Sequence, residues 1–157
     1  MSETILETVK HIRSVQGVLN LVVRDLLERS RIHDQSKLED PEKEIFDKFT
    51  PLLANSTFGS DEYMQFLKDM KPALDHHYSV NSHHPEHYKN GMDGMTLIDL
   101  IEMFCDWSAA VKRHKDGDLL RSIEINQKRF GYSDGLKEIL KNTAEYFSKG
   151  GSDGLSE

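Results

Sequence analysis

Histidines and acidic residues gather at a few places along this chain. Seven of its eight histidines are His11, His33 beside Asp34, and a group of five between residues 76 and 87: His76, His77, His83, His84 and His87. A further acid, Asp106, lies in an apolar segment downstream. Imidazole nitrogen and carboxylate oxygen are ligands of zinc, iron and manganese, and a chain with one cysteine must bind such ions through them. The ordered series therefore predicts a metal site.

Apolar residues recur every three or four positions along most of the chain, which predicts helices rather than strands. Thr4 and Glu7 are spaced as a capping box, and Asp40-Pro41 is typical of a helix start, with Pro72 a possible kink. We expect an all-α bundle of about six helices in one domain (1–149), with a disordered tail at 150–157. The expected helices cover residues 5–26, 41–54, 61–77, 95–113, 119–130 and 133–147.

These elements position the candidate ligands. His11 shares a helix face with Val15 and Val22, so we expect it to face the interior or a cleft. Residues 78–94 lack a period and form a long loop, and loops of this length are often functional. Asp99, Glu102 and Asp106 share one face of the apolar 95–113 helix. Buried carboxylates cost several kcal/mol unless they are paired or bound to metal.

Composition excludes several classes of function. The chain has 157 residues, 37% of them hydrophobic, which suits one domain with a real core. Its formal charge is −7, from 27 acids and 20 bases, so duplex nucleic acid is not an expected partner. The lone Cys105 fits a reducing compartment, and neither a membrane-spanning segment nor a signal peptide is evident. We expect a cytoplasmic protein without a membrane partner.

Three motifs resemble the HD superfamily of metal-dependent phosphohydrolases. His33-Asp34-Gln35-Ser36-Lys37 and His83-His84-Pro85-Glu86 are similar to elements of its HD-GYP branch, and Asp106-Trp107-Ser108-Ala109-Ala110 resembles its last metal-ligand helix. With His11, the resemblance spans residues 11–110. The chain is also similar to small bacterial and phage proteins of similar length. The Gly-Tyr-Pro element of the HD-GYP branch is absent, so hydrolysis of cyclic di-GMP is not predicted.

The resemblance implies a set of site residues. The first ion would be held by His11, His33, Asp34 and Asp106, with Asp34 placed to bridge to a second ion. His77, favoured over His76, would complete a second site or contact phosphate together with His83 and His84. Lys37 or Arg29 would contact a substrate phosphate, and either Glu86 or Glu102 would orient the water or a ligand histidine. One ion is a firmer inference than two, and its identity is open among Mn, Fe, Co, Zn, Ni and Mg.

The resemblance implies an enzyme that hydrolyses a small phosphorylated molecule, with a nucleotide as the expected substrate, through attack by metal-activated water. The catalytic residues would be Asp34, Lys37 and Glu86. Two alternatives stay open. One is a di-iron oxygenase on the same scaffold, because imidazole suits iron well. The other is a non-catalytic module that binds a nucleotide or a protein. The choice between phosphate monoester, triphosphate and diester, and the oligomeric state, are also open.

Overall fold

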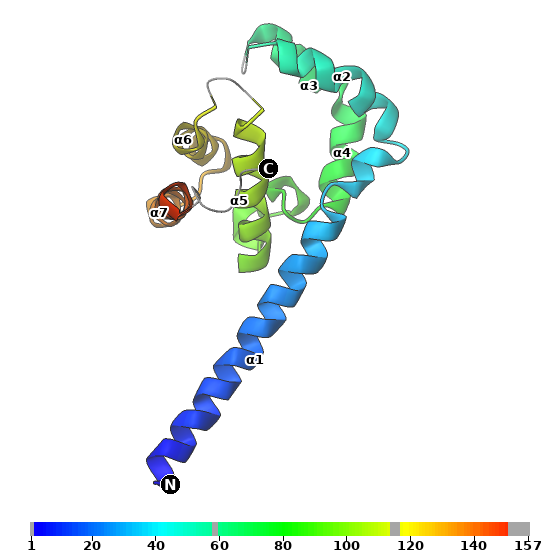
Figure 1. Cartoon of the computed structure of the whole chain (residues 1–157). Coiled ribbons are helices and arrows are strands. Elements are labelled where there is room, and N and C mark those ends of the chain that lie inside the picture. Colours follow the sequence, from blue (N-terminus) through cyan, green and yellow to red (C-terminus); the bar gives the residue numbers. More distant parts are fainter. Residues whose placement is uncertain (1, 58–59, 114–116, 151–157) are drawn as a thin grey trace. The chain divides into compact units, whose positions relative to one another are not determined.

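The chain is all-α, as the sequence predicts. The computed structural model describes residues 2–57, 60–113 and 117–150 (Figure 1). Within these ranges it has seven α-helices, three short 3-10 helices and no strand. The elements are α1 (Glu3–Ile32), η1 (Gln35–Leu38), α2 (Lys43–Asn55), α3 (Asp61–Asp69), α4 (Lys71–Val80), η2 (Pro85–His87), η3 (Gly91–Gly94), α5 (Leu97–Val111), α6 (Leu119–Phe130) and α7 (Asp134–Gly150).

The seventh helix arises from a break at Met70, where we expected one helix with a possible kink. Pro72 has no backbone N–H, and its ring clashes with the carbonyl four residues earlier, so the preceding helix does not continue through it. α3 therefore ends at Asp69, and α4 starts at Lys71 with the proline in its first turn. This boundary gives α4 its own direction, and α4 carries the histidine pair 76–77.

Two predicted helix starts are wrong. α1 is capped by Ser2, whose Oγ accepts from the Ile5 N–H, and Thr4 lies inside the helix. α2 begins at Lys43 with Glu42 at the N-cap position, so Asp40 is not an N-cap. The displaced start has a consequence for the site, because it leaves Glu42 just before α2.

The structure divides into two compact units, residues 1–33 and 34–157. The described part of the first unit is α1 and its flanking residues, and α1 is one uninterrupted helix (Figure 1). The boundary falls within the His33-Asp34 pair, where Asp34 takes a left-handed conformation with φ 57°. Of the predicted tail, residues 151–157 lie outside the described ranges, and Gly150 ends α7.

The core of the second unit forms where α5, α6 and α7 pack together. Phe104 of α5, Ile123 of α6 and Leu140 of α7 are buried there with Tyr132, whose hydroxyl donates to the Ile123 carbonyl at 2.5 Å. α2 packs against α3 and η1, and α4 packs against the same two elements. Among the described helices, none combines the length and the apolar character needed to cross a bilayer.

Candidate metal centre

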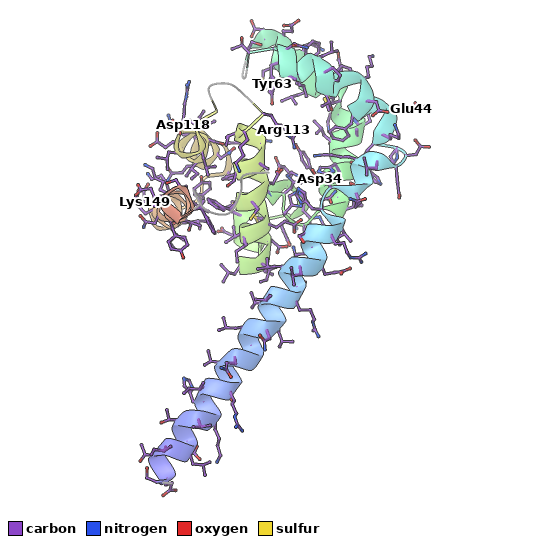
Figure 2. The ribbon with its side chains drawn as sticks, in the orientation of Figure 1. Asp34, Glu44, Tyr63, Arg113, Asp118 and Lys149 are labelled. Carbon is purple, nitrogen blue, oxygen red and sulfur yellow. The ribbon has the colours of Figure 1, made fainter. Side chains whose placement is uncertain are left out.

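One aspartate and three histidines of the second unit meet in what we call the histidine cluster: Asp34, His77, His83 and His84. One donor atom from each lies within 4.8 Å of the others. His77 Nε2 lies 2.9 Å from His84 Nε2 and 3.3 Å from Asp34 Oδ1, and His83 Nε2 lies 3.5 Å from the same oxygen. In Figure 2, Asp34 is labelled between α4 and α5.

The cluster depends on where α4 ends. Asn81 closes the helix through its backbone N–H, which donates to the His77 carbonyl at 3.0 Å. The chain then leaves the helix and turns back, so that His83 and His84 come opposite His77 of the last helical turns. Pro85 is buried directly after the pair and begins η2. The proximity of the three histidines is therefore a product of this turn.

Carboxylates lie behind two of the three histidines. His77 Nδ1 is 2.9 Å from Glu42 Oε2, and His83 Nδ1 is 3.2 Å from Glu102 Oε1. A carboxylate that accepts from Nδ1–H leaves the lone pair on Nε2, where a metal ion can bind it. Both Nε2 atoms lie within 3.5 Å of Asp34 Oδ1. Of the two acids that the sequence left open, Glu102 is therefore the one that contacts a cluster histidine.

Glu42 is the site residue that the sequence did not predict. Its side chain is fully buried, and it also contacts His76 Nδ1 at 2.7 Å and accepts from Ser36 Oγ at 3.1 Å. Thus His76 contacts Glu42, whereas its neighbour His77 belongs to the cluster. No spacing rule predicts the contact of Glu42 with His76 and His77, because 34 and 35 residues separate it from them.

The surroundings keep His84 neutral. Burial lowers the pKa of His84 to about 3, and the nearby His83 and His77 act in the same direction. Asp106 and Asp34 oppose the shift. A neutral imidazole is the form that binds metal. Carboxylate oxygens of Asp34 and Asp106 also lie within 4.8 Å of each other, an arrangement of like charges that a cation between them would stabilise.

Lys37, Glu86 and His87 are not members of the histidine cluster. Lys37 Nζ pairs with Asp34 Oδ2 at 2.6 Å, which leaves Asp34 Oδ1 directed at the histidines. Glu86 pairs with Arg129 at 2.6 Å rather than contacting a ligand histidine. Of the two acids predicted as alternatives for holding a ligand histidine, Glu102 is the one that contacts His83. His87 Nδ1 is 2.9 Å from the Tyr78 carbonyl.

Asp99 forms a structural network. It is 1% exposed and accepts from the hydroxyls of Ser82, Tyr88 and Thr96, and it completes the capping box of α5. This network attaches the segment that carries His83 to the start of α5. The acidic face expected on α5 thus serves different ends: Asp99 anchors a loop, Glu102 contacts His83, and Asp106 borders Asp34.

The structure contradicts the prediction that His11 and His33 bind one ion. Both belong to the first unit, where α1 is continuous from Glu3 to Ile32 and ends at His33. A helix rises about 1.5 Å per residue, so the two histidines of one chain lie roughly 30 Å apart. His11 is also exposed, contrary to the expectation from its helix face. His33 is half-buried and directly precedes Asp34 in the chain.

The fold and the site define an all-helical protein with a partly buried cluster of histidines and a carboxylate. Residues 1–146 match a family described as a family of unknown function (DUF5662), and the chain belongs to that family. No curated protein and no solved structure matches it.

Proposed function

We propose that this protein binds a divalent metal ion at the histidine cluster and hydrolyses a small phosphorylated molecule, a nucleotide being the leading candidate. The observation that carries the proposal is the convergence of three imidazole nitrogens and one carboxylate oxygen within 4.8 Å. Ligand atoms bound about 2.1 Å from one ion are separated by roughly 3.0 to 3.6 Å. The distances of 2.9, 3.3 and 3.5 Å within the cluster are close to that range.

The donor set favours a transition metal or zinc. Imidazole suits zinc, iron, cobalt, nickel and manganese, whereas magnesium prefers oxygen ligands and retained waters. The carboxylates behind His77 and His83 support the same interpretation, because a carboxylate behind the ring raises the basicity of a ligand histidine. The Glu42 side chain is fully buried. Burying an acid costs free energy unless its hydrogen bonds are satisfied.

A serine nucleophile is a poorer explanation of the same residues. Ser36, His77 and Glu42 are in contact, as a catalytic triad requires. However, Ser36 Oγ and Glu42 both approach Nδ1 of His77, at 3.2 and 2.9 Å. In a triad the serine and the acid contact opposite ring nitrogens. Here the opposite nitrogen, Nε2, lies beside Asp34 and His84 instead.

A bound divalent ion lowers the pKa of coordinated water toward about 7 and offsets charge that develops on a phosphoryl oxygen. The residues of the chain would have separate tasks. His77, His83, His84 and Asp34 hold the ion, and Asp106 adds charge beside Asp34. Lys37 donates a hydrogen bond to Oδ2 of Asp34, which orients that carboxylate and places a cation at the edge of the cluster.

The test measures metal content and turnover on chain purified without a histidine tag. We expect one ion per chain, and release of phosphate or nucleoside from some member of a nucleotide panel with manganese or cobalt present. Asp34→Asn should abolish both the binding and the turnover, whereas the exposed Asp93→Asn is the matched control and should change neither. Full metal occupancy without turnover of any phosphate ester would refute the hydrolase. Two irons per chain with oxygen consumption would instead identify an oxygenase.

A further inference from the structure

Beside the histidine cluster lies a cation that the proposed hydrolysis does not yet use. Arg129, near the end of α6, donates from Nη2 to Glu86 Oε1 at 2.6 Å. Glu86 lies in η2, two residues after His84. The ion pair therefore joins the last turn of α6 to the segment that carries two of the cluster histidines.

Tyr78 links Arg129 to the cluster. The Tyr78 ring lies 4.9 Å from the His84 ring, centroid to centroid. A side-chain hydrogen bond joins its hydroxyl to Arg129. One aromatic ring thus separates the guanidinium from a candidate metal ligand.

The guanidinium is held flat and remains accessible. Arg129 Cζ lies 4.7 Å from the centroid of the Phe130 ring, a cation–π contact that orients the planar group. The Arg129 side chain is 55% exposed, whereas Glu86 is 28% exposed.

We propose that Arg129, flanked by Tyr78, binds a phosphoryl oxyanion of the substrate, and that Glu86 occupies the guanidinium until that oxyanion arrives. A planar guanidinium with several N–H donors matches the oxygens of a phosphoryl group. Glu86 holds Arg129 in a ready orientation and competes with the ligand. The identification of the oxyanion as part of the substrate rests on the proposed function, whereas binding of phosphate at Arg129 does not.

The competing explanation is that the ion pair only ties α6 to η2. The two explanations predict different signs. If the pair is only a tie, Glu86→Gln and Arg129→Gln both break it and must change ligand binding in the same direction. If Arg129 binds the oxyanion, Arg129→Gln removes the binding group, and Glu86→Gln removes its competitor.

The experiment titrates the full chain with inorganic phosphate by calorimetry, in metal-loaded and metal-free arms. We expect Arg129→Gln to weaken phosphate binding about tenfold, the lower end for a charge-assisted hydrogen bond because the site is half exposed. Glu86→Gln should strengthen binding several-fold, and Arg129→Lys should retain part of it. Arg121→Gln on the same helix and Glu124→Gln, from the ion pair with Lys141, are matched controls expected to have no effect.

Changes of the same sign, or no change in either variant, would overturn the proposal. Circular dichroism melting of each variant establishes that it is folded. The two proposals fail separately. Opposite signs in the metal-free arm without any phosphate-ester turnover would retain the oxyanion site and reject the hydrolase. Turnover with equal signs would retain the hydrolase and reject the oxyanion site.

Discussion

Replacing Glu42 tests whether the histidine cluster is built for metal. Its fully buried carboxylate contacts Nδ1 of His77 at 2.9 Å and Nδ1 of His76 at 2.7 Å. In Glu42→Gln one acceptor oxygen becomes an NH2 group, which cannot accept from Nδ1–H. Where the NH2 group faces Nδ1 of His77, the imidazole proton must move to Nε2. A protonated Nε2, which faces Asp34, cannot bind a metal ion. The proposed metal site then loses a ligand atom, although the histidine itself remains.

The expected cost follows from this geometry. Removing a group that orients a metal-bound histidine lowers metal affinity by about 10- to 100-fold, which corresponds to about 1.4 to 2.7 kcal/mol. The metal-free protein should also lose about 1 to 3 kcal/mol of stability, because a buried donor is left without its acceptor. We therefore expect two separate losses, one in binding and one in folding.

The assay is a competition titration of zinc or manganese against a chromogenic chelator, with chemical denaturation of the metal-free chain alongside. Glu44→Gln is the matched control, because Glu44 has the same chemistry, lies near the start of α2 and is exposed. It should leave both quantities unchanged. If folded Glu42→Gln bound metal as tightly as the parent chain, the reasoning about the His77 tautomer would be refuted.

Three further predictions concern single residues. His11→Ala should leave metal stoichiometry unchanged in the same titration, because about 30 Å of helix separates His11 from His33; a lost ion would contradict this. Burial raises the pKa of Tyr132 to about 12 from 10.0, so the unfolded chain loses this proton first, and stability should fall as pH rises through that interval. Denaturation melts should show a smaller alkaline loss in Tyr132→Phe. Gly131→Ala should destabilise the fold by about 1 kcal/mol, because φ at Gly131 is +69°. Gly17→Ala inside α1, where a Cβ has open space around it, should instead stabilise the fold by roughly 0.5 to 1 kcal/mol. Stability changes of the same sign in chemical denaturation would refute this pair of predictions.

The helices follow from the sequence because their determinants are local. Hydrogen bonds between residues four apart and an apolar period near 3.6 are written in short windows of sequence. The residue types of the candidate site could also be predicted from the sequence, because they depend on side-chain chemistry and not on packing. Imidazole and carboxylate are the donors a metal takes, and His83, His84 and Asp34 stand out by type alone.

Tertiary structure decided how those donors are used. His76 and His77 are neighbours in sequence and both contact Glu42, and the packing of α4 against the segment before α2 places His77, rather than His76, in the cluster. The continuity of α1 separates His11 from His33, although the apolar pattern pointed His11 toward the interior or a cleft and the resemblance placed both at one ion. The assignment of Glu86 to Arg129, 43 residues away, was likewise beyond any spacing rule. Local periodicity specifies which residues form a helix and which face is apolar, whereas the partner of a buried carboxylate depends on how helices distant in sequence pack together.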